Sequence, residues 1–447
     1  MKILSMKRIF VILFISLSVN ALAQKDSLSF ELVDKATLYY YNTGNWQALI
    51  TLGKKAQRQG IDYYYLNYRL GTAYFMTENY MMSAEAFERA VEQNEGAVND
   101  TVLVKMLMLD YLYTKNFSKA EMLKKYHPRK ETRDYKFTKA VSQLYLEGGR
   151  AFVQNIENKA VDERKFYYFK QYDRLKDLRY INFDIQGFVA PGLSYQLAFS
   201  GLNLDRFQFF KEFPDTFLQD YSIKQSYLYA GINYRKGNFF INPAVNLPGY
   251  NSKEIVISDY DSLTGRNIYD TVKLVSRNLV LALRTGYYYR KMRFSIFGSI
   301  SNMHDSKQYQ AGAGFLYMPL GNLDLYFHTQ LTGHWEGGIA YLTIRQKAGF
   351  KLAPFLWSEL QFTIGNLHDY AADNGYYIYN TYDKINSITD LNLLFLINKH
   401  LELDLVLQYL WKENVMYSYP SKFNTEIQTT NYYFQQFNLI GGIKWKF

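Results

Sequence analysis

The stretch LIGGIKWKF, residues 439–447, indicates the fold class of this chain. One side of an extended backbone carries Leu439, Gly441, Ile443, Trp445 and Phe447, and the other side carries the residues between them, including two lysines. Such alternation is typical of a β-strand with one apolar face. Chain termini are usually polar and poorly ordered, so a strand that ends on an aromatic residue indicates a terminus fixed within a sheet. We expect this strand to close a β-barrel.

The other end of the sequence predicts export. Basic residues at positions 2, 7 and 8 precede an apolar run over residues 9–19, and Ala21 and Ala23 are small residues two positions apart. This pattern is typical of a secretory signal peptide, here residues 1–23, cleaved after Ala23. The alternative is a membrane anchor, but a spanning helix needs about 20 apolar residues. The run is too short for that.

Charge and cysteine content exclude several classes of function. Removal of residues 1–23 takes away three positive charges and no negative ones, which lowers the net charge from +10 to +7. Basic and acidic residues are interspersed, so no basic surface for nucleic acid is expected. The chain has no cysteine, which excludes disulfides and thiolate metal sites.

The aromatic content favours a membrane barrel. Aromatic residues make up 18% of the chain, with 43 Tyr and 32 Phe, while the mean hydropathy is only -0.27. In a transmembrane β-barrel only alternate residues face lipid, and aromatic residues gather at both interfaces. The sequence therefore predicts an outer-membrane β-barrel with no cofactor. A soluble all-β protein is the alternative.

Three short stretches in the N-terminal third match one another: YYNTGNW from Tyr40, YFMTENY from Tyr74 and YLYTKNF from Tyr111. In each, threonine follows the tyrosine by three positions, asparagine comes two later, and an aromatic residue follows. The spacings, 34 and 37 residues, correspond to one helix-turn-helix unit with Thr-x-Asn at its turn. We expect an α-helical repeat array over residues 24–146, in the periplasm.

This array resembles the tetratricopeptide repeat family, and the best copy covers residues 64–97. The resemblance implies a concave face that binds a peptide or a partner domain. The alternative is a generic array of helical hairpins without a binding function. Residues expected to pack the repeats are Tyr40, Trp46, Leu70, Gly71, Tyr74, Tyr80, Phe87, Ala90, Tyr111 and Phe117.

From residue 147 to residue 447 the sequence predicts a transmembrane antiparallel β-barrel. Tight connections are expected at 190–192, 235–238, 290–291, 319–322, 351–354 and 398–400. Long external loops are expected at about 157–177, 204–221, 248–274, 367–386 and 413–431. Short and long connections alternate. The last strand should end on the periplasmic side, from which the helical array also feeds the first strand, so the strand count must be even. We expect 14 strands, with 12 or 16 as alternatives, and a first strand in GGRAFVQNI from Gly148. The fold class is thus α+β.

The terminal strand also resembles the C-terminal signal of outer-membrane proteins that the barrel assembly machinery recognises. The resemblance is carried by Ile443, Trp445 and Phe447. It implies that the assembly machinery is a partner during biogenesis and that lipid surrounds the mature barrel. A closed barrel satisfies every backbone polar group inside lipid, which an open sheet cannot do.

Ionic residues occupy inward positions near the barrel end that carries the short turns. We expect opposite charges on adjacent strands to pair, because an unpaired charge is costly in a low-dielectric interior. Arg345 and Lys347 would neighbour Glu359, and Glu402 and Asp404 would lie beside Lys444 and Lys446. Such a lattice would fill or narrow the lumen. The alternative is a charge-lined pore constriction.

Catalytic and metal motifs are weak. His304-Asp305-Ser306 contains triad residue types, but a triad is assembled in space rather than in sequence. His328 is more simply a satisfied interior histidine. DYAADNG, from Asp369, has the oxygen donors of a calcium loop but no EF-hand spacing. We therefore predict no catalytic, cofactor or metal residues, and a protein that is not an enzyme.

The domain order resembles that of surface lipoprotein assembly modulators and of exopolysaccharide export porins. The leading hypothesis is a non-enzymatic outer-membrane barrel whose helical domain binds a periplasmic or outer-membrane protein partner for translocation, assembly or scaffolding. The alternative is a channel or exporter for a polymer or small solutes. No nucleic-acid partner is expected.

Overall fold

A computed structural model describes residues 27–126, 138–153, 167–213, 215–261, 266–381, 383–421 and 426–447. The signal peptide predicted at residues 1–23 lies outside the described residues. The chain divides into two units: one holds residues up to 77 together with 83–103, and the other holds 78–82 together with 104–447. None of the described helices is long and apolar enough to cross a bilayer.

Six α-helices occur in the described part of the N-terminal region. They are α2 (Phe30–Asn42), α3 (Trp46–Arg58), α4 (Tyr64–Met76), α5 (Tyr80–Gln93), α6 (Thr101–Tyr113) and α7 (Phe117–Tyr126), with a 3₁₀ turn, η2 (Glu95–Asn99), before α6. The Thr-x-Asn stretches lie at the turns after α2, α4 and α6, as the sequence predicts. Thr43, Thr77 and Thr114 each donate their hydroxyl to a carbonyl four residues earlier, at 2.7 to 2.9 Å. The repeated threonine therefore satisfies carbonyls that the helix end leaves free.

Glycine sets the spacing of the helices in the first unit. A Cβ at Gly53 would lie 2.7 Å from the Leu70 side chain, and one at Gly71 would lie 2.6 Å from the Phe87 ring. Leu70 and Phe87 are fully or almost fully buried. Of the expected packing residues, Leu70, Gly71, Tyr74, Phe87, Ala90 and Tyr111 are buried, and Tyr40, Trp46, Tyr80 and Phe117 are half-buried.

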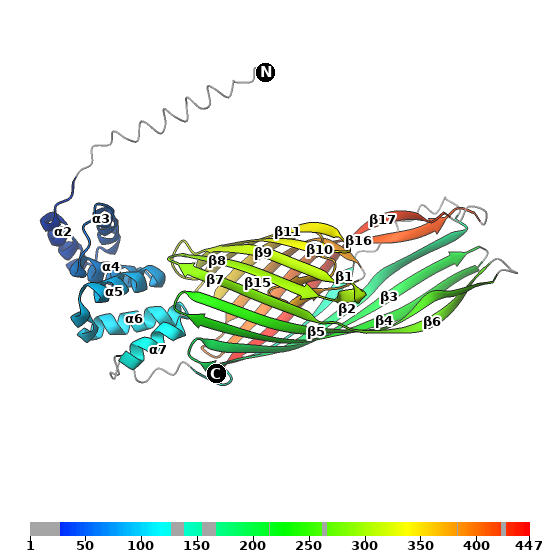
Figure 1. The fold of residues 1–447 in the computed structure, drawn as a ribbon, viewed down its shortest axis with the longest axis horizontal. Helices are drawn as coiled ribbons and strands as arrows, with labels where there is room; N and C mark the ends of the chain where they lie inside the picture. Colours follow the sequence, from blue (N-terminus) through cyan, green and yellow to red (C-terminus); the bar gives the residue numbers. More distant parts are fainter. Residues whose placement is uncertain are drawn as a thin grey trace, which may run out of the picture. The chain divides into compact units, whose positions relative to one another are not determined.

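The barrel is a closed ring of 14 antiparallel strands (Figure 1), as the sequence predicts. The strands of the sheet are β1 (Gln143–Val153), β2 (Phe169–Ala190), β3 (Leu193–Glu212), β4 (Asp215–Lys236), β5 (Phe239–Asp261), β6 (Arg266–Arg277), β7 (Val280–Tyr289), β8 (Met292–Ser301), β9 (Gln308–Tyr317), β10 (Leu325–Glu336), β11 (Ile339–Ala353), β12 (Leu356–Ile364), β15 (Lys384–Leu396), β16 (Leu401–Tyr419) and β17 (Gln428–Lys446). β6 pairs only with β5, as a hairpin outside the ring.

The terminal strand closes the barrel. β17 pairs with β1 from Gln143–Lys446 to Val153–Gln436, and with β16 on its other edge. The ring is complete because β4 also pairs with β5, which joins the two ends of the row of strands. The backbone N–H of Phe447 donates to the Ser142 carbonyl at 3.0 Å. The last residue is thus fixed within the sheet, as its alternation indicates.

Three predicted loops are wrong, because the strands continue through them. β3 and β4 remain paired as far as Glu212 and Asp215, and β16 and β17 as far as Ser418 and Gln428. Residues 248–274 are largely the β5–β6 hairpin. Part of the expected loop at 157–177 belongs to β2, which begins at Phe169. The inner wall of a barrel is polar, so polar sequence does not mark the end of a strand. Figure 1 shows these strands extending past the others at one end of the barrel.

The barrel is apolar outside and polar inside. On β17, Leu439, Ile443 and Trp445 are exposed, while Gln436 and Asn438 are buried. On β16, Leu403 is 37% exposed and Glu402 is 4% exposed. The apolar face of each strand is therefore the outer one, opposite to the arrangement in a soluble β-protein.

Candidate functional site in the barrel lumen

The connection between β12 and β15, expected as an external loop, carries a short hairpin. β13 (Tyr370–Ala372) pairs with β14 (Tyr377–Tyr379). At the tip, Asp373, Asn374 and Gly375 have φ of 47°, 62° and 80°, a region that these residue types tolerate. The DNG sequence weighed as a calcium loop therefore forms a turn. Residues 366–381 are called the lumen hairpin below.

The lumen hairpin crosses the barrel interior. Tyr370 Oη donates to Thr332 Oγ1 of β10 at 3.1 Å, and Tyr376 Oη donates to Asp184 Oδ2 of β2 at 3.2 Å. The same number of strands separates β2 from β10 in either direction around the ring, so these two contacts lie on opposite walls. Asn246 of β5 also donates its Nδ2 to the Gly375 carbonyl at 2.8 Å. Backbone and side chains together bridge the lumen.

Apolar contacts hold the base of the hairpin. Leu367, Tyr370 and Ala372 pack in one buried cluster with three residues of the barrel wall, Ile385, Ile388 and Leu410. Tyr370 is only 1% exposed. Apolar residues are unusual in a loop that is exposed to solvent. Their presence in this stretch is the sequence signal that could have predicted the insertion of the hairpin into the lumen.

An ion pair joins the hairpin tip to the wall. Arg345 Nη1 lies 2.6 Å from Asp373 Oδ1, and the Arg345 side chain is 3% exposed. Arg345 was expected beside Glu359, but its partner comes from the hairpin instead. Lys347 Nζ does lie 2.7 Å from Glu359 Oε1. Lys347 and Glu359 are therefore paired as the sequence predicts, whereas Arg345 pairs with Asp373.

The other half of the expected lattice lies near the barrel closure. Lys444 Nζ is 3.8 Å from Glu402 Oε2, and Lys446 Nζ also forms an ion pair with Glu402. Asp404 accepts a hydrogen bond from Tyr145 Oη at 2.9 Å. The four residues line the inner wall of β16 and β17, and Glu402 forms ion pairs with both lysines.

A buried charge cluster was missed by sequence analysis. Arg206, with no exposed side-chain surface, forms two hydrogen bonds with Asp383, of 2.9 and 3.1 Å, and an ion pair with Asp173. Lys412 Nζ lies 3.5 Å from Asp383 Oδ2. Both Arg206 and Asp383 lie in stretches that were expected to be loops. Their side chains meet only because the strands continue and the lumen hairpin folds inward.

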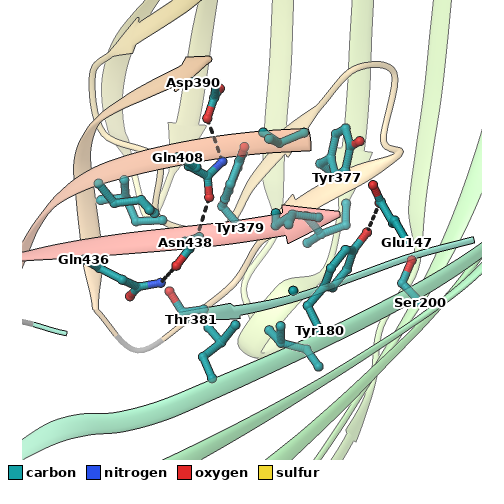
Figure 2. A pocket seen from close by; sticks show the side chains of 18 of the residues that line it. Glu147, Tyr180, Ser200, Tyr377, Tyr379, Thr381, Asp390, Gln408, Gln436 and Asn438 are labelled. Atoms are coloured by element: carbon teal, nitrogen blue, oxygen red, sulfur yellow. Dashed lines mark hydrogen bonds between the residues drawn. The ribbon is translucent and has the colours of Figure 1, made fainter. Parts of the chain in front are cut away.

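A cavity of about 260 Å³ lies beside the hairpin (Figure 2). Four adjacent strands, β12, β15, β16 and β17, present one inward residue each at directly opposed positions. Their side chains form a chain of hydrogen bonds with donor–acceptor distances of 2.6 to 2.8 Å. We call this set the polar row, and it comprises Gln361, Asp390, Gln408 and Asn438. The cavity is completed by tyrosines, including Tyr180, Tyr377 and Tyr379.

Two barrel histidines, His304 and His328, were considered as catalytic residues from the sequence. His304 Nδ1 lies 2.9 Å from both carboxylate oxygens of Asp369, so it contacts the hairpin rather than a catalytic serine. His328 is 9% exposed on the inner face of β10. The imidazole packs against Gly314 of β9, because a Cβ atom added at that glycine would lie only 3.2 Å from His328 Nε2.

These features define the chain as a closed 14-strand antiparallel β-barrel with a hairpin across its lumen, preceded by a helical region. No protein-family model matches the sequence, and no curated protein matches it. Solved outer-membrane barrels do match. The Pseudomonas putida toluene transporter TodX has 6% identity over 70% of this chain and 91% of its own, with a TM-score of 0.44.

Two further structures give similar values. A Pseudomonas aeruginosa FadL homologue has 8% identity over 69% of this chain and 90% of its own, with a TM-score of 0.42. The translocator domain of the autotransporter NalP from Neisseria meningitidis has 8% identity over 75% of this chain and 99% of its own, with a TM-score of 0.30. Values this low carry no inference about solute, partner or mechanism to this chain.

Proposed function

We propose that this protein is a gated outer-membrane conduit for a small polar solute, and that the lumen hairpin is its closed gate. The observation that carries the proposal is the hairpin itself, which bridges opposite walls of a polar lumen through Thr332 and Asp184. The tip of the hairpin is held to the wall by separate side-chain contacts, including the ion pair of Asp373 with Arg345. None of these contacts belongs to the pairing of the barrel strands, so the tip can leave the lumen while its apolar base stays packed on the wall.

The placement in a membrane is supported by the outer wall. Leu342 and Ile344 of β11 are 63% and 41% exposed, while Thr343 and Arg345 between and beyond them are buried. A continuous apolar exterior on a closed ring is the arrangement that hydrocarbon requires. The expected signal peptide and the terminal aromatic strand agree with export and with insertion by the barrel assembly machinery.

The connections between strands support an orientation for the barrel. The chain enters β1 at the barrel end where β17 finishes, since Gln143 pairs with Lys446. The turns before Met292 and Leu356 lie at this same end, whereas the strands that extend past the others, such as β3, β4, β16 and β17, do so at the opposite end. Short turns of outer-membrane barrels are periplasmic, so we place the helical region in the periplasm and the entrance of the lumen hairpin at the outer side.

The cavity favours a solute rich in hydroxyl groups. Amides of the polar row both donate and accept hydrogen bonds, and Asp390 adds an acceptor. Tyr377 and Tyr379 of the hairpin supply flat apolar surfaces beside them. A sugar has both hydroxyl groups and apolar ring faces, so we propose a saccharide as the class of solute.

Replacement of residues 367–380 by a short Gly-Ser linker tests the proposal. In planar bilayers, the intact barrel should show little current and the variant a sustained current, because the bridge across the lumen is gone. The matched control inserts the same linker between Gly337 and Gly338, where a Cβ would meet nothing within 4 Å. Liposomes should then swell faster with a neutral sugar than with a charged solute of equal size.

The interpretation is unambiguous if both variants keep the heat-modifiable migration of a folded barrel. A folded hairpin-less barrel that passes no current would refute the gate. Faster passage of the charged solute would refute the saccharide while leaving the gate standing.

The second candidate function is recruitment of a periplasmic or outer-membrane protein by the helical region. It is favoured by aromatic side chains that α2 and α4 leave in solvent: Phe30, Tyr39 and Tyr65 are 59%, 64% and 59% exposed. A full-length triple serine variant at these positions should lose a cross-linked partner that the native chain retains. Retention of the same partner would exclude this surface.

A further inference from the structure

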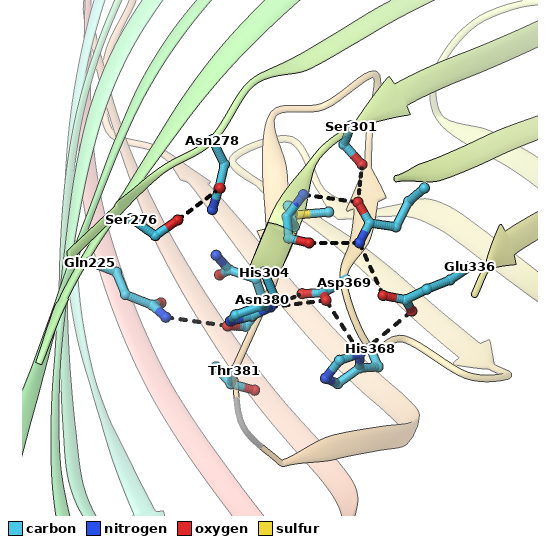
Figure 3. A network of polar contacts seen from close by, with 12 residues as sticks. Gln225, Ser276, Asn278, Ser301, His304, Glu336, His368, Asp369, Asn380 and Thr381 are labelled. Atoms are coloured by element: carbon cyan, nitrogen blue, oxygen red, sulfur yellow. Dashed lines mark hydrogen bonds and ion pairs between the residues drawn. The ribbon is translucent and has the colours of Figure 1, made fainter. Parts of the chain in front are cut away.

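Imidazole and carboxylate groups converge where the lumen hairpin leaves the barrel wall (Figure 3). Glu336 ends β10, His368 and Asp369 begin the hairpin, and His304 comes from the 3₁₀ turn η3 (Met303–Asp305) between β8 and β9. One ligand atom from each of Glu336, His368 and Asp369 lies within 4.8 Å of the others. Three segments that are distant in sequence thus meet at one point.

The distances are those of ligands around an ion rather than of hydrogen bonds. His368 Nδ1 lies 3.7 Å from Glu336 Oε2 and 3.5 Å from Asp369 Oδ2. A hydrogen bond would bring these atoms to about 2.7–3.2 Å. Tetrahedral Zn²⁺ with bonds of about 2.0–2.1 Å places its ligand atoms roughly 3.4 Å apart. The two distances from His368 Nδ1 are therefore close to the spacing of ligand atoms around such an ion.

Surrounding groups hold the Glu336 carboxylate in place. Gln308 Nε2 donates to Glu336 Oε1 at 3.0 Å, which leaves Oε2 directed to His368. Gln308 is itself fixed, because its Oε1 accepts from Ser301 Oγ at 3.0 Å and from the Met303 backbone N–H at 2.9 Å. Such outer partners orient the ligands of metal sites.

Charge balance is the second observation. Within the described residues, neither Glu336 nor Asp369 has a lysine or arginine within 4.0 Å, and their ion pairs are with histidines alone. The Asp369 side chain is only 1% exposed. A buried carboxylate without a permanent positive partner is costly, and a divalent cation would supply the missing charge.

A further imidazole lies on the same strand as Glu336 and makes no hydrogen bond among the described residues. His334 precedes Glu336 by two positions on β10, so both side chains point into the lumen. His334 is fully buried, and neither of its ring nitrogens has a hydrogen-bond partner among the described residues. Its ring contacts the Tyr370 ring of the lumen hairpin, with ring centroids 6.1 Å apart. The lumen beside Glu336 thus holds an imidazole whose nitrogens are not satisfied by the described protein groups.

We propose that Glu336, His368 and Asp369 bind a divalent transition-metal ion, with Zn²⁺ as the best match, and that the ion fastens the lumen hairpin to β10. Mixed nitrogen and oxygen ligands suit this class of ion better than Ca²⁺ or Mg²⁺, which prefer oxygen alone. His304 acts from outside the coordination shell by hydrogen bonding to Asp369. The site stands on its own geometry, and only an effect of the metal on current rests on the proposed gate.

Titration of the EDTA-dialysed full-length protein with ZnCl₂, followed by calorimetry, tests the site. The native chain should bind one Zn²⁺ per barrel, and His368→Ala should reduce the affinity at least tenfold. His304→Ala should weaken binding by about 10- to 100-fold, as loss of an outer-shell partner does. Co²⁺ in place of Zn²⁺ should give visible absorption bands that disappear in His368→Ala.

The matched control is His400→Ala, which removes a half-buried barrel histidine whose Nδ1 contacts the Lys446 carbonyl. It should bind Zn²⁺ like the native chain. Glu336→Gln preserves the shape of the ligand and separates coordination from folding, since heat-modifiable migration should be unchanged. Absence of stoichiometric binding, or equal affinity of the native, His368→Ala and Glu336→Gln proteins, would overturn the site. Metal binding without any change in current would leave the site intact and count against the gate alone.

Discussion

At the scale of single residues, Arg206 shows how the lumen tolerates charge. Its guanidinium has no exposed surface and contacts Asp173 and Asp383, while Lys412 adds a second cation beside Asp383. Two positive and two negative groups therefore balance inside the barrel. Desolvation of each group is costly, and the pairing offsets that cost only while every partner remains in place.

Removal of one partner is therefore expected to be severe. Arg206→Met should lower the free energy of unfolding by about 3–5 kcal/mol, because it leaves buried carboxylates uncompensated. Arg179→Met is the control, since Arg179 and Asp205 form an ion pair whose side chains are 59% and 31% exposed. Exposed pairs contribute about 0–1 kcal/mol. Urea unfolding followed by tryptophan fluorescence measures both, and equal changes would contradict the role assigned to the cluster.

At the scale of elements, small residues and a polar contact determine how the N-terminal helices pack. Two glycines, Gly53 and Gly71, permit close approach of the helices, and a partly buried polar contact joins α2 to α4. Arg69 Nη1 lies 2.8 Å from Asp34 Oδ1, and Tyr63 Oη donates to the same oxygen at 2.9 Å. Burial raises the pKa of Asp34, but the hydrogen bonds from Arg69 and Tyr63 and the Arg69 charge outweigh it. The pKa of Asp34 is therefore below its usual 3.8.

The helical region should consequently lose stability in acid. A carboxyl group with a lowered folded-state pKa stabilises the fold above its unfolded pKa, and this contribution is lost as the pH falls through the folded pKa. The native melting temperature should exceed that of Asp34→Asn near neutral pH, and the difference should shrink below about pH 4. Circular dichroism at the helix band measures both melts.

Glu31→Gln is the matched control, because Glu31 and its partner Lys35 are both 76% exposed. It should melt like the native chain at every pH. A gap between native and Asp34→Asn that stays constant down to pH 3 would show that Asp34 acts through shape rather than charge. Burial raises the pKa of Tyr63 to about 12, so its donated hydrogen bond persists throughout this range.

At the scale of the whole molecule, the decisive property is which solvent surrounds the barrel. Apolar side chains such as Leu342, Ile344 and Ile443 cover its exterior. In water such a surface would be an aggregation hazard, whereas in lipid it is the required boundary. Function follows from the same arrangement, because the polar residues displaced inward line the lumen.

A charged residue introduced on the outer wall tests whether hydrocarbon or water surrounds the barrel. Ile344→Arg, toward the middle of β11, should destabilise a barrel folded in liposomes by about 2–4 kcal/mol. Ile339→Arg, at the start of the same strand and 56% exposed, should cost about 0–1 kcal/mol near the interface. Reversible unfolding from liposomes gives both values. If Ile344→Arg proved neutral, water rather than hydrocarbon would surround this face.

The sequence by itself determined the periodic features of this protein. Alternation in residues 439–447, even strand number and short turns are local or repeat at fixed intervals, so they follow from chain geometry alone. The Thr-x-Asn turns are local in the same sense. Contacts between neighbouring strands, such as Lys347 with Glu359, followed from register.

Only the tertiary structure decided what fills the lumen. Polar sequence does not reveal whether a segment faces water or the polar interior of a barrel, so the continuation of β3 through Arg206 and the inward course of the lumen hairpin were not foreseen. Arg345 meets Asp373, and His368 meets Glu336, across distances in sequence that periodicity does not constrain. The inward course of the hairpin makes both contacts, and the lumen that it enters exists only because all the strands together close the ring.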